Sequence, residues 1–393
     1  MLVLEYKVKG SDKQYQAIEE SIKTTQFVRN KCLRHWMDAK KEDKINRFAL
    51  NKYSTELRNE FKFVKDLNSM SVQSAAERAW FAISRFYHNC KSSKSGKKGF
   101  PRFQKDNRST EYKTSGWKLH KTKRRITFTD KKGIGELKLL GKWDIHTYPV
   151  KAIKRVRLVR RADGYYCQCS IDVDSFKQLE STGNQVGLDV GLEYFYSDSN
   201  GNHVENPRFL RKAEKNIKRS QRRIYKHKKG SNKRRKSRKI YARKHLKVSR
   251  QRTEFAKRVA LTLVSSNDVI VYEDLVVKNM VKNHCLAKSI NDVAWRLFRQ
   301  WLEYFSNKYG RQAIAVKPHY TSQICPSCNS KVRKTLSTRT HICKCGCNLH
   351  RDTAAAIVIL ERATGGHPES NAQGVATSTL FGESLVEQVA TMN

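Results

Sequence analysis

The stretch VGLDVGL at residues 186–192 sets an acidic residue, Asp189, inside an apolar run of the kind that forms a buried strand. A carboxylate without a partner is costly in such a place. The flanking Gly187 and Gly191 permit the close approach of another backbone or of a phosphate. The stretch therefore predicts a buried strand that carries a candidate metal-binding acid.

Two further acids occupy comparable places in the chain. Glu273 follows the β-branched run of VIVYEDL at 269–275, and Asp352 falls in the first turn of a predicted helix, HRDTAAAIVILERAT at 350–364. Three carboxylates that meet at one point repel one another unless cations lie between them. Two divalent ions about 4 Å apart would relieve that repulsion, activate water and stabilise a leaving oxygen. Asp189, Glu273 and Asp352 therefore predict a hydrolytic site for two Mg²⁺ or Mn²⁺ ions.

Each acid taken alone also has a purely structural interpretation. Asp352 could cap its helix, and Glu273 or the neighbouring Asp274 could simply end a strand. The three acids are about eighty residues apart in the chain, and such separations do not by themselves bring them together.

A cysteine cluster separates the second acid from the third. Five of the ten cysteines fall within 325–347, and two knuckles, Cys325-Pro-Ser-Cys328 and Cys343-Lys-Cys345, supply four thiols. Tetrahedral zinc takes thiolates from two such turns, and clustered cysteines indicate metal binding rather than cross-linking. The cluster predicts one Zn²⁺ bound by Cys325, Cys328, Cys343 and Cys345. Other candidates for the fourth ligand are Cys347, His341 and His350.

The charge of the chain indicates a polyanionic partner. The 393 residues include 80 Lys plus Arg against 36 Asp plus Glu, a formal net charge of +44. Residues 208–252 hold 22 of the basic residues and one acid, so the rest still carries 58 against 35. Self-repulsion on this scale opposes compaction, and counterion release favours nucleic acid. The sequence contains no apolar stretch of about twenty residues, which is the length that would suggest a membrane span. The start, MLVLEYKVKG, does not resemble a signal peptide, so an intracellular protein is expected.

The pattern of apolar residues predicts an α+β chain of several domains. A strand over 1–9 precedes a helical region over 12–89 and a strand-rich region over 100–178, in which Asp163-Gly164 indicates a hairpin turn. After STGN at 181–184, a strand pair closes at Asn200-Gly201. The elements predicted after this strand pair are helices with wide polar faces over 208–252, a helix over 255–266, a strand with Glu273, a helix over 293–310, a strand over 313–318 and the helix over 350–364.

The motifs resemble those of the TnpB family, encoded by prokaryotic insertion sequences and similar to compact type V CRISPR nucleases. The resemblance runs from residue 1 to about 362. The motifs that carry it are GFPRF at 99–103, GLDVG at 187–191, NPRFLRKAEKNIKRSQRR at 206–223, VYEDL at 271–275, SINDVAW at 289–295, YTSQICPSC at 320–328 and CGCNLHRDTAAAIVI at 345–359. The second knuckle is one residue shorter than is usual in the family, and Thr353 replaces the usual asparagine.

The resemblance implies a multidomain architecture. It assigns 1–9 and 96–180 to a β-barrel wedge domain with a helical recognition lobe, 10–95, inserted. It assigns 181–317 and 350–364 to a RuvC-like nuclease of the RNase H fold, in which Asp189, Glu273 and Asp352 are catalytic. The zinc ribbon at 318–349 is inserted there, and 365–393 is expected to be a flexible tail.

The resemblance also implies partners: a guide RNA made from the transposon end, and double-stranded target DNA carrying a short adjacent motif. The expected protein is a monomer in the prokaryotic cytoplasm, associated with the nucleoid. Candidate nucleic-acid contacts are Thr55, Gln73 and Arg102 in the first half of the chain and Arg222, Arg223, Arg234 and Arg235 in the basic helices.

Three other functions compete with a guided endonuclease. The first is a nuclease-inactive relative that binds DNA through guide RNA and represses transcription; such a protein would be expected to lose active-site acids, and all three are present. The second is a transposase that joins DNA ends itself. The third is a plain RNA-binding protein with zinc for folding only, which explains the charge but not the three acids.

Overall fold

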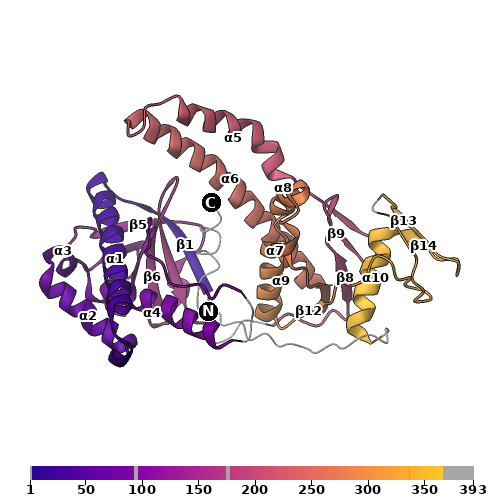
Figure 1. Ribbon diagram of the computed structural model, residues 1–393, viewed down its shortest axis with the longest axis horizontal. Helices are drawn as coiled ribbons and strands as arrows, with labels where there is room; N and C mark the ends of the chain where they lie inside the picture. The colour runs from indigo at the N-terminus through magenta and orange to yellow at the C-terminus, as the bar shows by residue number, and fades with distance from the viewer. Residues whose placement is uncertain (1, 93–95, 174–177, 336, 366–393) are drawn as a thin grey trace. The chain divides into compact units, whose positions relative to one another are not determined.

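The computed structural model describes residues 2–92, 96–173, 178–335 and 337–365 (Figure 1). The chain divides into two units, Met1–Ser175 and Phe176–Asn393, each organised around its own sheet. The predicted α+β class is confirmed. The tail expected over 365–393 lies, except for Gly365, outside the described residues. Within these ranges no helix has the length and apolar character needed to cross a membrane.

The first unit is built on a seven-stranded antiparallel sheet of order β2-β6-β7-β1-β5-β4-β3. Its strands are β1 (Leu2–Lys9), β2 (Ser109–Tyr112), β3 (Trp117–Leu119), β4 (Arg125–Phe128), β5 (Glu136–Leu140), β6 (Ile153–Arg161) and β7 (Gly164–Ile171). β1 lies at the centre, so the first residues of the chain pair with strands more than 120 residues away. The predicted hairpin turn at Asp163-Gly164 is confirmed, because Arg161 pairs with Gly164, whose φ is +138°.

This sheet curls. β2 and β3 stand at opposite ends of the strand order, yet only residues 113–116 separate them, which span no more than about 18 Å. The ring of Tyr112 in β2 lies 4.8 Å from that of Phe128 in β4. Tyr112 is fully buried, so the curled sheet closes around an apolar core. That core includes Tyr6, Val8, Ile126, Leu137, Leu139, Val156, Leu158, Cys167 and Ile171.

Four α-helices complete this unit: α1 (Asp12–Asp38), α2 (Arg47–Glu60), α3 (Lys62–Lys65) and α4 (Ser69–Lys91). Short 3-10 turns occur at Lys41–Asp43, Thr114–Gly116, Ile145–Thr147 and Val150–Ala152. A capping box begins α1, where Ser11 and Gln14 exchange hydrogen bonds. Ile18 and Ile22 of α1 pack into the sheet core, whereas Val28 and Leu33 pack with α2 and α4. α1 therefore joins the helical layer to the sheet.

A buried carboxylate fastens the helices to the sheet. Glu111 of β2 is 3% exposed and accepts hydrogen bonds from Arg155 at 2.9 Å, Arg157 at 2.6 Å and Ser74 of α4 at 3.0 Å. Arg78 of α4 lies 3.7 Å away. Burial alone would raise the pKa of Glu111, but Arg157, Arg78 and Arg155 outweigh it and lower the pKa to about 2.

The second unit is built on a five-stranded sheet of order β10-β9-β8-β11-β12. Its strands are β8 (Gln185–Asp189), β9 (Tyr194–Asp198), β10 (His203–Glu205), β11 (Val269–Glu273) and β12 (Gln312–Val316). β8, β11 and β12 are parallel, whereas β9 and β10 are antiparallel to their neighbours. The predicted turn at Asn200-Gly201 is confirmed, with a φ of +88° at Gly201.

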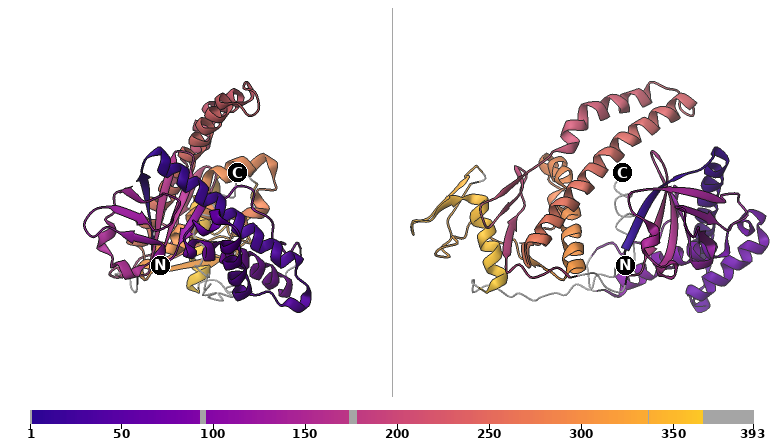
Figure 2. Two further views of the ribbon diagram at one scale, coloured as in Figure 1. Left: turned by 90° about the vertical axis from the view of Figure 1, so that its left-hand side faces the viewer. Right: turned by 180° about the vertical axis from the view of Figure 1, so that it is seen from behind.

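Helices cover both faces of this sheet (Figures 1 and 2). One face packs against α6 (Asn232–Ser266), α8 (His284–Val293) and α9 (Trp295–Tyr309) through Leu188, Ile270 and Tyr272. The other face carries α10 (Arg351–Thr364), whose Ile359 packs on Val271. The remaining elements are α5 (Phe209–Tyr225), α7 (Val277–Met280), β13 (Thr340–Ile342) and β14 (Asn348–His350).

Two helix boundaries differ from the sequence predictions. The helix predicted over 255–266 is the last third of α6, which runs without interruption for 35 residues and pairs with α5 as a hairpin (Figure 1). The helix predicted over 293–310 is α9, which begins two residues later, at Trp295, because Ala294 has a φ of +60° and separates it from α8. Neither boundary has a glycine or proline to announce it, so the apolar pattern alone did not place them.

Asp268 ties together the starts of β8 and β11. It directly precedes β11 and accepts hydrogen bonds from the backbone N–H groups of Thr182 at 2.9 Å and Gly183 at 2.8 Å. The hydroxyl of Ser181 and the guanidinium of Arg311 also bind its carboxylate. The hydrogen bonds, with that of Ser181 foremost, lower the pKa of Asp268. The STGN stretch is thus a loop wrapped around a carboxylate.

We predict that Glu111→Gln destabilises the chain by about 3 kcal/mol, because it removes one side of a buried ion pair and leaves Arg155 and Arg157 without their counter-charge. The depressed pKa of Glu111 gives stability that is present above the unfolded pKa of about 4.3 and is lost as the pH falls toward 2. Wild type should therefore lose stability more steeply than the variant between about pH 5 and 2. Urea unfolding of the full chain by near-UV circular dichroism measures both effects. The exposed Glu56→Gln is the control, and equal stability of all three proteins would contradict the assignment.

Candidate functional site

Asp189 and Glu273 end two adjacent parallel strands. In the pairing of β8 with β11, Leu188 lies opposite Tyr272, so the next residue of each strand is one of the two acids. Leu188 and Tyr272 face the core shared with α6 and α9. Because side chains alternate along a strand, Asp189 and Glu273 face the other way, toward α10.

Asp352 reaches the same face from the start of α10. It lies in the first turn of that helix and is 9% exposed. Helix α10 packs directly on β8, where a Cβ built at Gly187 would lie 2.1 Å from the carbonyl oxygen of Ala356. Any side chain at residue 187 would force the helix away. The sequence-based expectation that Gly187 admits another backbone is therefore confirmed.

The electrostatics bring the three acids into one group. Burial raises the pKa of Asp189 well above its usual value, and the charges of Glu273 and Asp352 raise it further. Burial also raises the pKa of Glu273. Among the described residues, the sets of ligand atoms that all lie within 4.8 Å of one another are made of cysteine and histidine, so the three carboxylates do not form such a set. The arrangement is an anionic site that a cation would stabilise.

Three residues around the acids were not predicted from the sequence. The hydroxyl of Thr321 donates a hydrogen bond to Glu273 at 2.5 Å, and Nε of Arg351 donates to Asp352 at 3.1 Å. Arg362 of α10 lowers the pKa of Glu273 by its charge. Thr321 and Arg351 lie in motifs that were recognised, YTSQICPSC and CGCNLHRDTAAAIVI, but nothing in a linear motif indicates which acid each would contact.

Asp274 has a different environment from Glu273. It forms an ion pair with Arg299, and its backbone N–H donates to the carbonyl of Val316. Asp274 is thus held by Arg299 and by the backbone of Val316, apart from the group formed by Asp189, Glu273 and Asp352.

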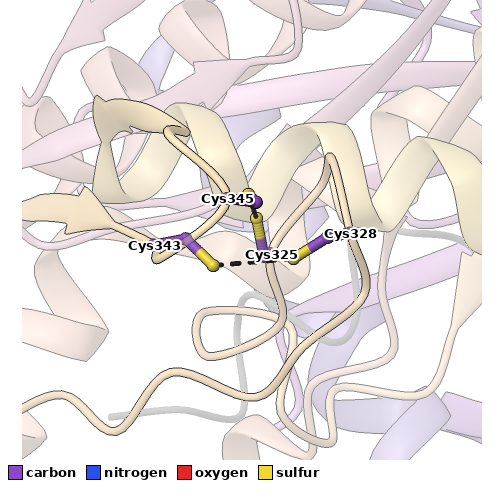
Figure 3. Close-up of side chains that lie close together, drawn as sticks. All are labelled: Cys325, Cys328, Cys343 and Cys345. Carbon is purple, nitrogen blue, oxygen red and sulfur yellow. Dashed lines mark hydrogen bonds between the residues drawn. The ribbon is translucent and has the colours of Figure 1, made fainter.

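The cysteine knuckles converge as predicted (Figure 3). The sulfur atoms of Cys325, Cys328, Cys343 and Cys345 all lie within 4.8 Å of one another, with Cys325 to Cys345 at 3.6 Å and Cys328 to Cys343 at 3.5 Å. A tetrahedron with Zn–S bonds of about 2.3 Å has sulfurs about 3.8 Å apart. Hydrogen bonds from Ser330 lower the pKa of Cys328 to about 6, which favours the thiolate. The four thiols fit one zinc ion.

A second, smaller set overlaps the first. Cys325, His341 and Cys347 also have ligand atoms within 4.8 Å of one another. His341 is fully buried, and neither ring nitrogen has a hydrogen-bond partner. Since this set offers three ligands and the other offers four, the geometry favours Cys345 as the fourth ligand. His350 belongs to neither set and packs against His203 and Tyr194.

The candidate nucleic-acid contacts fall in different environments. Arg222, Arg223 and Arg235 are exposed on the α5–α6 hairpin. Arg234 is half-buried, donates a hydrogen bond to the carbonyl of His227 at 3.0 Å and stacks on Tyr225, so it also holds the turn between the two helices. In the first unit, Thr55 is exposed on α2, Gln73 is half-buried on α4, and Arg102 is exposed in the loop after α4.

We predict that Cys345→Ser abolishes zinc binding, whereas Cys347→Ser retains one zinc ion per chain, because only Cys345 belongs to the four-thiol set. Metal analysis of the purified chain after dialysis against a weak chelator measures the stoichiometry. Cys90→Ser, an exposed cysteine of α4, is the control. Loss of zinc in Cys347→Ser with retention in Cys345→Ser would reverse the assignment.

Two family models match the chain. One, described as a probable transposase, matches residues 167–284, and the other, the TNB domain of Cas12f1-like proteins, matches residues 295–359. The first match contains Asp189 and Glu273, and the second contains the four cysteines and Asp352.

Curated relatives match over most of their length. A Streptomyces pristinaespiralis protein named "Putative RNA-guided DNA endonuclease" is 27% identical over 364 residues, which cover 90% of this chain and 87% of that protein. InsQ of Escherichia coli strain K12, which bears the same description, is 25% identical over 315 residues, 76% of this chain and 74% of its own.

Among solved structures, the chain is similar in fold to Cas12f1 in its cryo-EM complex with guide RNA and target DNA. The TM-score is 0.51 at 15% identity, covering 88% of this chain and 81% of that one. The residues matched by the two family models contain the motifs GLDVG, VYEDL and CGCNLHRDTAAAIVI in their expected order. Motifs, family models and curated relatives agree, and the chain is similar to proteins of the TnpB family.

Proposed function

We propose that this chain is an RNA-guided DNA endonuclease that hydrolyses target DNA with divalent ions held by Asp189, Glu273 and Asp352. The observation that carries the proposal is the meeting of the three acids on the α10 face of the second sheet. Three mutually repelling carboxylates do not stabilise a packed core. Metal-dependent hydrolysis of a phosphodiester, in contrast, requires carboxylates that bind divalent ions. The names of the two curated relatives support the same reaction.

The proposed architecture follows from the two sheets. Residues 181–317 and 350–364 form a RuvC-like nuclease of the RNase H fold, interrupted by a zinc ribbon at 318–349. The mixed sheet, with α10 returning onto β8 after the ribbon, supports this assignment. Residues 1–9 and 96–180 form the wedge-type barrel and 10–95 the recognition lobe, which the curl of the first sheet and the packing of α1 to α4 support.

The acids fit hard divalent cations. Mg²⁺ and Mn²⁺ prefer carboxylate oxygens, and such ions would relieve both causes of the raised pKa of Asp189, its burial and the negative charges of Glu273 and Asp352. When bound, two such ions would activate water and stabilise the leaving oxygen of a phosphodiester. Asp189, Glu273 and Asp352 are the residues that would hold the ions, and the charges of the other two acids both act on Asp189. The N-terminus of α10 orients Asp352, and Gly187 keeps that helix against β8.

The partners in this proposal are a guide RNA from the transposon end and complementary double-stranded DNA. Guide pairing supplies sequence specificity, while exposed arginines of the α5–α6 hairpin contact phosphates. Gln73 and Thr55 are the proposed readers of the adjacent motif, and Arg102 is a further proposed nucleic-acid contact. One chain acts per site, in the prokaryotic cytoplasm and on the nucleoid.

The decisive test is cleavage of a plasmid library of adjacent motifs by the chain purified with RNA from its flanking locus. We expect Mg²⁺-dependent linear product with one enriched motif. Asp189→Asn should reduce the rate by more than about a hundredfold, because losing a direct ligand costs more than the 10–100-fold typical of its supporting partners. Asp274→Asn, the neighbour of Glu273 that is paired with Arg299, is the matched control and should reduce the rate far less.

Other outcomes would identify other functions. Bound RNA and motif-specific DNA binding without cutting in wild type would indicate a guided repressor. Joining of transposon ends without RNA would indicate the transposase that the first family model names. Absence of bound RNA would contradict the guided reaction itself.

The basic hairpin gives a separate prediction. Replacing Arg222, Arg223 and Arg235 together by Gln should weaken binding of all sequences alike and reduce the slope of log affinity against log salt by about 2 to 3, since each lost phosphate contact contributes about 0.9. Arg234 is left in place because it holds the turn. The triple Arg→Lys variant keeps the charge and should keep the slope. An unchanged slope in the Gln variant would exclude this hairpin as a phosphate-binding surface.

A further inference from the structure

Two of the three acids are held by residues that border the cysteine ribbon. Thr321 lies four residues before Cys325 and donates its hydroxyl to Oε1 of Glu273 at 2.5 Å. Arg351 lies four residues after Cys347 and donates Nε to Oδ1 of Asp352 at 3.1 Å. The zinc-binding segment thus reaches the acids from both of its ends.

Thr321 is fixed by the fold of the segment that leads into the first knuckle. It is 5% exposed and follows Tyr320, whose φ is +58°. The carbonyl of Tyr320 accepts from the N–H groups of Gln323 at 2.9 Å and Ile324 at 3.0 Å, which closes the turn before Cys325. The hydroxyl of Thr321 therefore has a position set by the same turn that presents the first thiol.

The start of this segment is also tied to the helix that carries Asp352. Arg362 of α10 donates two hydrogen bonds of 2.6 Å, to the carbonyls of Lys317 and His319. A displacement of the segment relative to α10 would break both bonds and move Thr321 away from Glu273.

Arg351 is fixed by the other side of the ribbon. Its NH1 donates to the carbonyl of Thr338 at 3.0 Å, and its backbone N–H donates to the carbonyl of Arg339 at 2.8 Å. Arg339 in turn pairs with Glu193 at 3.0 Å, in the loop that follows Asp189. β13 and β14 pair across the turn that carries Cys343 and Cys345, so the guanidinium depends on the folded ribbon.

We propose that Thr321 and Arg351 are positioning residues through which the zinc ribbon orients Glu273 and Asp352, so that zinc binding and divalent-ion binding at the acids are thermodynamically coupled. The inference rests on the proposed function. A hydrogen bond to one carboxylate oxygen fixes the rotamer and leaves the second oxygen for an ion, which reduces the entropy lost when the ion binds. Coupling of this kind is reciprocal: ions at the acids stabilise the zinc-loaded ribbon by the same factor.

The test measures Mn²⁺ binding to the full, zinc-loaded chain by calorimetry. Thr321→Val removes the hydroxyl at nearly constant volume and should weaken Mn²⁺ binding by about 10-fold to 100-fold. Thr321→Ser restores the hydroxyl and should bind within about threefold of wild type. Thr340→Val, the same change at an exposed position of β13, is the control and should bind as wild type does. Zinc content and thermal midpoint should be the same in all four proteins.

Arg351→Lys separates geometry from charge. Lysine retains the positive charge but cannot donate to Asp352 and to the carbonyl of Thr338 through one planar group, so Mn²⁺ binding should weaken here as well. In wild type, saturating Mn²⁺ should slow the loss of zinc to a competing chelator, and in Thr321→Val that protection should fall with the Mn²⁺ affinity.

Two results would overturn the proposal and are distinguishable. If Asp189→Asn removes Mn²⁺ binding but Thr321→Val binds as wild type, or if Thr321→Ser fails as Thr321→Val does, the positioning role is wrong and the metal site stands. If Asp189→Asn binds Mn²⁺ as wild type does, the acids are not the metal site, and the proposed function fails together with the coupling.

Discussion

Helix α10 lies on strand β8 with the carbonyl of Ala356 where a side chain at residue 187 would be, and the acidic site depends on this contact. The strands alone bring Asp189 and Glu273 side by side, since their register is set by backbone pairing. Asp352 comes from another part of the chain and has no such register. It reaches the other two because a glycine lets a helix approach a sheet at backbone distance, and because the segment between β12 and α10 returns to the same face. The position of Asp352 therefore depends first on the space that Gly187 leaves for helix α10.

Two groups of charged residues give a carboxylate opposite electrostatic environments, one that lowers its pKa and one that raises it. Glu111 sits among Arg78, Arg155 and Arg157, which lower its pKa and make it a fastener between helix and sheet. Asp189 is half-buried; burial raises its pKa, and the charges of the carboxylates Glu273 and Asp352 raise it further. Arg351 and Arg362 offset part of this effect, yet the pKa values of Asp189 and Glu273 remain raised. The first arrangement is complete within the protein, whereas the second would be completed by the cation that we propose.

Much of the fold and of the site could be predicted from the sequence because the signals were local. Asp163-Gly164 and Asn200-Gly201 mark turns by their backbone needs, and the two cysteine knuckles mark a metal site by spacing. The features that the sequence did not predict depended on tertiary packing. Strands β2 and β3 have four and three residues, too few for a periodic pattern, and they exist because their neighbours pair with them. The break at Ala294 has no glycine or proline to mark it. Thr321 could not be assigned to Glu273 because a contact across 48 residues leaves no trace in either stretch.

The uninterrupted course of α6 has a mechanical consequence. At 1.5 Å per residue its 35 residues make a rod about 50 Å long, with basic side chains along its first half and Ala256, Ala260 and Val264 embedded in the sheet core at its far end. The helix is capped by Asn267, which is followed by Asp268. Asp268 accepts hydrogen bonds from the loop before β8 and directly precedes β11. A force on the hairpin would therefore be transmitted along α6, which is unbroken, to the starts of β8 and β11. These are the two strands that end at Asp189 and Glu273. If the hairpin binds nucleic acid as proposed, tension in that ligand would reach the strands that carry two of the three acids.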